Sequence, residues 1–494
     1  MHKMLYKIYM IIISLIMVFQ VNLYANDTNK LYPFKDISKY GYMDKFGNVK
    51  INPSFDFAYE FSEGYAGVLI GINIYYINLD GEIIFELGNY SEAPIPNFPT
   101  FNDNIIITTK DGLFGYMDNT GKIISEPVYL EATSFKDGLA CVIKDNKSYI
   151  IDRNGKIKTQ LDDDIEIIGN FYDDLALYKS KSSGKYGYID KAGNIVIKAL
   201  YSDAFNFSEG LACVSIDNSV IYGFINNKGD FVIQARSEAP FSFSEGLCIF
   251  IENNKYGFLD KTGNVVIPAK YDEVLGFSDG LASVRINDKW GFIDKKGEIV
   301  IEPKYMQVYF FENDIASVYD SDNTFYINKN GDIISPKLNN QNENSDYDYI
   351  SLNVKYDSLI QGISCKAGTT VTFNYGGDLV SATLSKDAIV KEMPCKGGTE
   401  VSFGLSCHFT LSKDFKIGDI VFKENTEYWE AEGCYGGILA NDQDIYGFPC
   451  KGNTELTINT GSVTIYLTLS KDFEINGEKH KAGDTISAVY EDLN

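Results

Sequence analysis

Residues that could carry out chemistry are few and scattered in this sequence of 494 residues. Apart from His2, only His408 and His480 could serve as the base of a Ser-His-Asp or Cys-His site. They lie far apart, neither has a distinctive motif around it, and surface or strand positions explain both. The many carboxylates could hide a glycosidase pair, but no spacing exposes one. We therefore expect no catalytic residue and a protein that is not an enzyme.

The eight cysteines fall into two groups. Cys141, Cys213 and Cys248 each occupy a Leu-Ala-x-Val type of segment, where a small apolar side chain is expected, so we predict buried thiols. The second group consists of the five cysteines in the last third of the chain. In an exported protein such a group predicts disulfides; the pairing is not determined, and the odd number leaves one cysteine over. Its members are Cys365, Cys395, Cys407, Cys434 and Cys450. No C-x-x-C pair occurs, so zinc and thioredoxin-like sites lack their spacing.

Recurring Asp-x-x-Gly turns are the remaining candidates for a metal site. They lack the further Asp or Asn ligands and the Glu of a calcium-binding loop. Hairpin turns, in which the Asp side chain caps local backbone groups, explain them better. We expect no metal and no cofactor.

The first 25 residues predict a secretory signal peptide. Lys3 and Lys7 precede an apolar stretch from Ile8 to Phe19, and Ala25 is the small residue at the expected cleavage site. The stretch is short for a membrane span, and an uncleaved N-terminal anchor is the alternative. We expect an exported protein, periplasmic, cell-surface or secreted, with no membrane span after cleavage.

Without residues 1–25 the chain keeps 42 basic against 68 acidic residues, a formal charge of -26. Nucleic acid is therefore excluded as a partner, because its binding depends on Lys and Arg that neutralise phosphates. Solubility of an aromatic-rich surface explains the charge, and attraction of cations or of a basic partner is the alternative.

A step of aromatic, glycine and aromatic recurs through the first two thirds of the chain. Its central glycines are Gly41, Gly115, Gly187, Gly223, Gly257 and Gly291. An Asp or Asn then leads, three residues later, to a turn glycine: Gly47, Gly121, Gly193, Gly229, Gly263 or Gly297. With weaker copies at 76–81, 149–155 and 325–331 there are nine turn glycines, and five of the eight intervals between them are 34 residues.

Two further positions keep a fixed distance from the turn glycine. Fourteen residues after it comes a Phe, at Phe61, Phe135, Phe207, Phe243, Phe277 and Phe311. Seventeen residues after it comes a second glycine, at Gly64, Gly138, Gly210, Gly246 and Gly280. A strand, a glycine turn, a returning strand, a second turn and a third strand account for this order, so each unit should be an antiparallel meander of about three strands. Neighbouring meanders must stack to bury the recurring Phe and Leu.

The sequence therefore predicts an all-β fold: a tandem array of about nine short meanders over residues 36–336. Nine units exceed the usual four to eight blades of a propeller and favour an open, solenoid-like arc, with a propeller-like ring as the alternative. The unit resembles the WG β-repeat, or KWG repeat, of bacterial proteins. Only one copy, at Trp290, carries the Trp of that name. The resemblance implies a repeat scaffold and brings no catalytic residue with it.

A polar linker at 337–350 leads to a second β domain at 351–494. Its repeats are marked by Cys365, Cys395 and Cys450, each followed by a Lys, a glycine-containing turn and alternating apolar residues. We expect about three units in this domain. For the whole chain we expect a non-catalytic scaffold that binds a protein partner, with carbohydrate or cell-wall binding, possibly hydrolytic, through exposed aromatic residues as the alternative.

Overall fold

The computed structural model describes residues 29–89, 99–216, 221–237, 239–320, 323–337, 349–403, 406–417, 420–460, 462, 464–475 and 477–489. The expected signal peptide at 1–25 and most of the expected linker at 337–350 lie outside these residues. The chain divides into two compact units. The array unit comprises Met1–Pro53, Tyr59–Tyr65 and Ile95–Asn339, and the C-terminal unit comprises Ser54–Ala58, Ala66–Pro94 and Asn340–Asn494.

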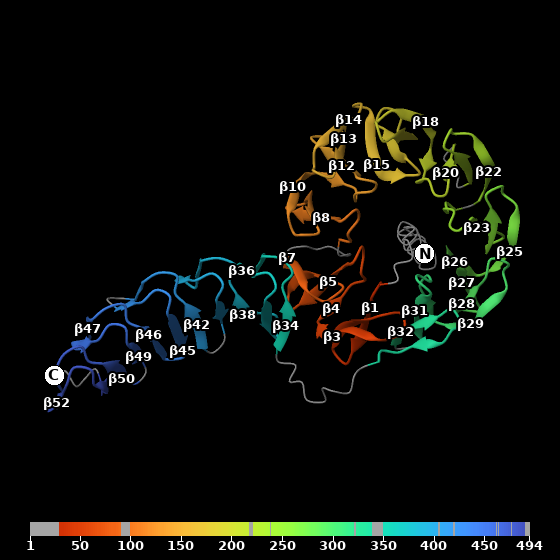
Figure 1. Cartoon of the computed structure of the whole chain (residues 1–494). Helices are drawn as coiled ribbons and strands as arrows, with labels where there is room; N and C mark the ends of the chain where they lie inside the picture. Colours follow the sequence, from red (N-terminus) through yellow and green to blue (C-terminus); the bar gives the residue numbers. More distant parts are fainter. Residues whose placement is uncertain are drawn as a thin grey trace, which may run out of the picture. The chain divides into compact units, whose positions relative to one another are not determined.

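The repeats form small antiparallel sheets, as predicted, and the described residues up to 337 contain nine of them, the second of which belongs mainly to the C-terminal unit (Figure 1). The first three sheets are β1 (Tyr32–Asp36), β2 (Lys39–Met43), β3 (Val49–Phe55); β4 (Phe57–Ala58), β5 (Tyr65–Ile70), β6 (Asn73–Asn78), β7 (Ile83–Asn89); and β8 (Ile105–Lys110), β9 (Leu113–Asp118), β10 (Ile123–Tyr129). The next three are β11 (Glu131–Ala132), β12 (Leu139–Lys144), β13 (Lys147–Asp152), β14 (Ile157–Gln160); β15 (Ile165–Tyr172), β16 (Leu175–Ser180), β17 (Tyr186–Asp190), β18 (Ile195–Tyr201); and β19 (Asp203–Ala204), β20 (Leu211–Ser215), β21 (Tyr222–Asn226), β22 (Phe231–Ser237). The last three are β23 (Leu247–Glu252), β24 (Lys255–Asp260), β25 (Val265–Tyr271); β26 (Glu273–Ser278), β27 (Leu281–Ile286), β28 (Lys289–Ile293), β29 (Ile299–Tyr305); and β30 (Gln307–Val308), β31 (Ile315–Asp320), β32 (Asn323–Asn328), β33 (Ile333–Ile334).

The strand that follows the second glycine belongs to the sheet of the next aromatic-Gly-aromatic step. In β27, for example, Ala282 pairs with Ile293 of β28, which in turn pairs with Ile299 of β29. Ser278 of β26, which precedes Gly280, already pairs with Leu281 of β27, so the chain crosses from one sheet to the next between β25 and β26, before the second glycine turn. We call the last long strand of each sheet, which follows the turn glycine, the return strand.

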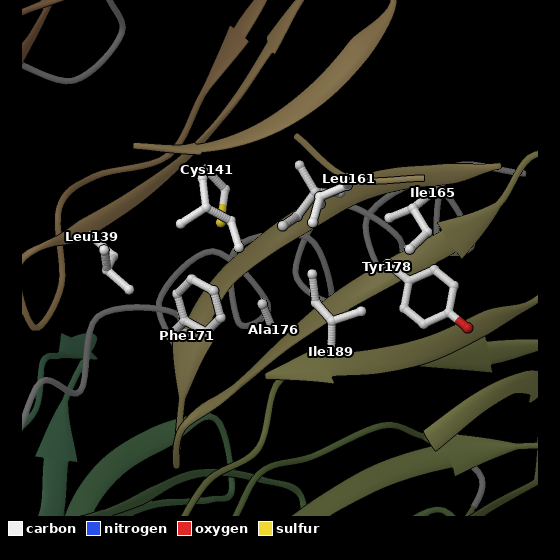
Figure 2. Packing of buried hydrophobic residues seen from close by; sticks show 10 residues of the cluster. Leu139, Cys141, Leu161, Ile165, Phe171, Ala176, Tyr178 and Ile189 are labelled. Carbon is white, nitrogen blue, oxygen red and sulfur yellow. The ribbon is translucent and has the colours of Figure 1, made fainter. Parts of the chain in front are cut away.

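Hydrophobic side chains fill the space between neighbouring sheets. One cluster joins Leu139 and Cys141 of β12 to Phe171 of β15 and Ala176 of β16, and Figure 2 shows these side chains facing one another. Because one meander cannot bury a core alone, this packing between sheets supplies the stability of the array.

The first and last repeats of the array unit contact each other. The Tyr326 hydroxyl of β32 donates a hydrogen bond to the Pro33 carbonyl of β1 at 3.0 Å, and the Lys337 N–H donates one to the Gly47 carbonyl at 2.7 Å. Of the two expected arrangements, these are the contacts that the propeller-like ring requires.

The C-terminal unit continues with twenty strands. They are β34 (Tyr349–Asn353), β35 (Ser358–Ile360), β36 (Ile363–Cys365), β37 (Thr370–Asn374), β38 (Leu379–Thr383), β39 (Ala388–Val390), β40 (Met393–Cys395), β41 (Glu400–Ser402), β42 (Ser406–Thr410), β43 (Phe415–Ile417), β44 (Ile420–Phe422), β45 (Glu427–Ala431), β46 (Cys434–Ile438), β47 (Gln443–Ile445), β48 (Phe448–Cys450), β49 (Glu455–Asn459), β50 (Thr464–Thr468), β51 (Phe473–Ile475), β52 (Glu478–His480) and β53 (Thr485–Val489). Among the described residues there is no helix with the length and apolar character needed to cross a membrane.

The C-terminal domain contains five repeats within its described residues, not the three expected. Each begins with an Asp whose carboxylate accepts the backbone N–H ten residues later at 2.8 or 2.9 Å, across a short hairpin. These residues are Asp357, Asp387, Asp414, Asp442 and Asp472. Two copies were missed because Phe422 and His480 stand where the other copies have Cys.

Candidate interaction surface

The recurring Phe residues lie in the core. Each packs edge to face against the second aromatic of the preceding aromatic-Gly-aromatic step, with ring centroids 4.7–5.0 Å apart. The Phe residues of these pairs are Phe61, Phe135, Phe207, Phe243, Phe277 and Phe311, all buried. Trp290, the Trp of the repeat name, is buried too. None of these rings is free to hold a ligand.

The central glycine of each aromatic-Gly-aromatic step lets two strands approach closely. A Cβ on Gly257 would lie 2.5 Å from the Ile267 carbonyl oxygen of the return strand, where the register of β24 and β25 shifts. At the other five positions, Gly41, Gly115, Gly187, Gly223 and Gly291, the nearest backbone oxygen would be 2.5–2.8 Å away. No side chain fits there.

The turn glycines and the second glycines share a left-handed backbone, with φ between 78° and 89°. The turn glycines are Gly47, Gly121, Gly193, Gly229, Gly263 and Gly297, and the second glycines are Gly64, Gly138, Gly210, Gly246 and Gly280. Both sets shape the chain and bring no functional group to the surface.

The Ser and the acidic residue that precede many of the second glycines tie each repeat to the next. The Ser244 hydroxyl donates to the Phe277 carbonyl at 2.7 Å, and the Gly280 N–H donates to the Glu245 carboxylate at 3.0 Å. The Glu245 carboxylate also pairs with the Lys295 ammonium at 3.1 Å. Equivalent acid-to-backbone contacts start from Glu63, Asp103, Asp173, Glu209 and Asp279. The carboxylates of these six residues therefore hold neighbouring repeats together.

In the Asp-x-x-Gly turns the Asp carboxylate accepts backbone N–H groups of its own turn. The Asp260 carboxylate accepts the N–H groups of Thr262 and Asn264, both at 2.9 Å. These hydrogen bonds, with that of the Thr262 hydroxyl as the largest contribution, lower the pKa of Asp260 to about 2. Within the described ranges, no three His, Cys, Asp or Glu side chains gather as a metal site would require.

The expected disulfides are not formed. All eight cysteines lie within the described residues, and each is a free thiol. Cys365, Cys395 and Cys450 occupy the same place in three of the five hairpins, with each Sγ 3.4 Å from the carbonyl oxygen two residues earlier. Because one such Cys lies in each of three different hairpins, these thiols fill repeated core positions instead of meeting in pairs. Burial raises the pKa of Cys450 to about 12, so its thiol stays protonated. Cys407 and Cys434 are not joined in a disulfide either, and the Lys391 ammonium donates to the Cys407 Sγ at 3.4 Å.

Neither histidine belongs to a catalytic arrangement that the described residues display. His408 lies on β42 with its Nδ1 2.7 Å from the Glu427 carboxylate on β45, an exposed cross-strand contact. His480 ends β52, at the hairpin position that Cys occupies elsewhere.

The array's outward-facing apolar residues gather on the return strands. In three repeats the second and third residues after the turn glycine are aliphatic and both are 41–51% exposed. These pairs are Ile195 with Val196, Val265 with Val266, and Ile299 with Val300. We call them the edge pairs. The fixed spacing of Gly and Phe does not single them out, although two adjacent apolar residues in an otherwise alternating strand are a visible signal.

In β7 the pair at the same positions as the edge pairs is covered by the chain itself. In β7 the equivalent residues Ile83 and Ile84 are 0% and 1% exposed. Within the C-terminal unit, the Lys355 N–H donates to the Ile83 carbonyl at 2.7 Å. The Ser358 hydroxyl donates to the Ile84 carbonyl at 2.8 Å. The segment that begins the C-terminal repeats therefore docks on a return strand.

Two acidic residues flank this covered pair. The Glu82 carboxylate pairs with the Lys355 ammonium at 2.8 Å, and hydrogen bonding to that ammonium lowers the pKa of Glu82. The Glu86 carboxylate accepts the Gln361 N–H at 2.6 Å. Burial raises the pKa of Glu86 against the opposing effect of this hydrogen bond. The docked segment thus meets an acid, two aliphatic residues and a second acid.

A shallow polar depression of about 360 Å³ lies in the array unit. Its lining includes Asp103, Lys122 and Arg153. The Arg153 guanidinium donates to the Asp103 carbonyl at 2.9 Å, so part of this lining belongs to the connections between repeats. It carries no set of groups suited to a particular ligand.

Comparison with known proteins identifies the repeats. The family model described as WG containing repeat matches residues 40–71, 114–147, 186–219, 222–256, 256–290 and 290–322. A search of curated proteins found no match. Similar solved structures include a eukaryotic initiation factor, at 9% identity over 62% of this chain and 94% of that chain with a TM-score of 0.46.

Two further similar structures come from bacteria. One is apo AztD from Citrobacter koseri, at 14% identity over 62% of this chain and 94% of that chain with a TM-score of 0.32. The other is virginiamycin B lyase from Staphylococcus aureus, at 15% identity over 48% of this chain and 92% of that chain with a TM-score of 0.28. At TM-scores below 0.5 these likenesses carry no conclusion about function. The family match agrees with the repeat geometry, and the chain belongs to the WG-repeat proteins.

Proposed function

We propose that this protein is an exported, non-catalytic scaffold that binds other proteins along the edge pairs of its return strands. The observation that carries the proposal is the contrast between equivalent positions. Ile83 and Ile84 are buried under a polypeptide segment, whereas the edge pairs of other repeats are 41–51% exposed. A surface that binds protein in one repeat is thus presented again, uncovered, in others.

The chemistry of the exposed positions favours protein over carbohydrate. Sugar binding uses aromatic rings as stacking platforms. The exposed pairs are Ile and Val, and the recurring aromatic residues of the array are committed to the core. Aliphatic side chains on a strand edge suit an extended polypeptide, which can add main-chain hydrogen bonds to apolar contact.

The test compares the full chain with two variants in a pull-down from cell-envelope extract. One variant carries Ser at the six positions of the three edge pairs. The control carries Ile37→Ser and Ile72→Ser, at exposed positions outside the return strands. We expect a saturable protein partner that the wild type and the control retain and the edge-pair variant loses. Retention of purified glycan without a protein partner, or equal capture by all three proteins, would refute the proposal.

A further inference from the structure

The repeat at 297–302 reproduces the residues with which β7 holds its docked segment. After Gly81 come Glu82, two Ile, Phe85 and Glu86, and after Gly297 come Glu298, Ile299, Val300, Ile301 and Glu302. The acids stand one and five residues after the turn glycine in both repeats. Among the nine repeats, only these two have an acid at both positions.

The two acids of the 297–302 repeat are exposed, whereas the two acids beside β7 contact the docked segment. Glu82 pairs with Lys355 and Glu86 accepts the Gln361 N–H. Glu298 and Glu302 are exposed, and within the described part of the chain their carboxylates have no ion pair. Ile299 and Val300 between them are 46% and 44% exposed.

We propose that β29 is a second docking strand for a polypeptide, one that presents an extended segment with the chemistry of Lys355–Gln361. The proposal rests on the proposed function and names the partner segment for one edge pair. Such a segment carries a cationic side chain opposite Glu298. A hydroxyl side chain three residues later faces the strand, and a free backbone N–H six residues after the cation faces Glu302.

Main-chain hydrogen bonds and apolar contact with Ile299 and Val300 supply the binding, and the acids select the segment. Asp294 stands where the first site has Asn78, so the second site carries one more negative charge beside Glu298. This difference strengthens the preference for a cation. In the first site the Gln361 side-chain amide donates to the Tyr75 hydroxyl at 3.2 Å. At the second site Gly291 stands at the position of Tyr75, so a Gln side chain is not required there.

The probe is a fluorescent peptide with the sequence of residues 351–363, titrated into the full chain and followed by anisotropy. We expect saturable binding that weakens at least about tenfold in Glu298→Gln with Glu302→Gln. The matched control, Glu126→Gln with Asp230→Asn, also removes one charge five residues and one charge one residue after a turn glycine, but from repeats without the acid pair, and should bind as the wild type does. A peptide with Lys355→Glu should bind at least about tenfold more weakly.

Three results would overturn the proposal. One is no saturable binding of the peptide. Another is equal weakening by the paired and the control variants, which would indicate attraction to net charge alone. The third is weakening by Glu82→Gln but not by the paired variant, which would place the peptide at β7 by exchange with the chain's own segment. If any of these occurs while the envelope partner still depends on the edge pairs, the second docking strand is refuted and the proposed function stands.

Discussion

Replacing Gly257 by Ala should separate two strands of one repeat. The new Cβ would lie 2.5 Å from the Ile267 carbonyl oxygen, 2.7 Å from the Ala269 nitrogen and 2.8 Å from a ring carbon of Phe250. All three distances are shorter than a packed carbon atom tolerates, and two of the atoms are backbone that cannot rotate away. The strands β24 and β25 must therefore move apart or lose their register.

The expected cost is about 3 kcal/mol, the upper part of the range for overpacking. Two glycines nearby isolate the cause. At Gly280 a Cβ would meet nothing within 4 Å but φ is +85°, so Gly280→Ala should cost about 1–2 kcal/mol from backbone strain alone. At Gly276 φ is ordinary and the nearest atom is 4.0 Å away, so Gly276→Ala should lie within about 1 kcal/mol of the wild type.

Urea unfolding followed by far-ultraviolet circular dichroism would measure these differences. Because repeat proteins can unfold in parts, the three variants should be compared at the same transition and with equal slopes. The order Gly257→Ala, Gly280→Ala, Gly276→Ala is expected, from most to least destabilised. A Gly257→Ala protein as stable as the Gly276→Ala protein would refute the account of the aromatic-Gly-aromatic step as a close strand contact.

Three further results are expected. Phe277→Ala should cost about 3–5 kcal/mol, because the ring is 1% exposed and packs 4.8 Å from Phe258; a loss under 0.5 kcal/mol in urea unfolding would contradict its place in the core. Thiol labelling without reductant should modify all eight cysteines in denaturant but chiefly the half-buried Cys434 in the folded protein, and fewer than eight in denaturant would reveal a disulfide. Glu86→Gln should raise the midpoint of thermal unfolding at pH 7, with a gain that fades as the pH falls toward about 4.5, the ordinary pKa of Glu. The reason is that a carboxyl whose pKa is raised in the folded protein favours folding when it is protonated, and this contribution is lost as the pH rises. Gln stays neutral at every pH, so a gain that grew at low pH would contradict the prediction.

The periodic residues made much of the array predictable. Fixed offsets of Gly and Phe predicted short antiparallel meanders, and Gly263 and Phe277 have the turn and core geometry that such meanders need. The reason for Gly257 was not predictable, because its conformation is ordinary and its need for glycine comes from the backbone of another strand. Spacing along the chain does not report such an approach.

Spacing also misled where a repeat varies at its marked residue. In the C-terminal domain the Cys marker found three copies, whereas Asp357 and its four counterparts each perform the same capping and define five. The expectation of disulfides arose from the same marker. Cysteines that recur at one place in different repeats stay apart, because each fills its own layer of the core.

Each repeat contains packed positions that maintain the fold and exposed positions that can determine binding specificity. Signature residues such as Gly257, Phe277 and Glu245 are held by contacts with other strands or repeats, so they cannot vary without loss of packing. The positions one and five residues after the turn glycine are exposed in most repeats, so substitution there leaves the core untouched. Glu82 and Glu86 show what such positions can do when a segment docks on them. A tandem scaffold of this kind can therefore hold one fold constant while each repeat edge is fitted to a different polypeptide.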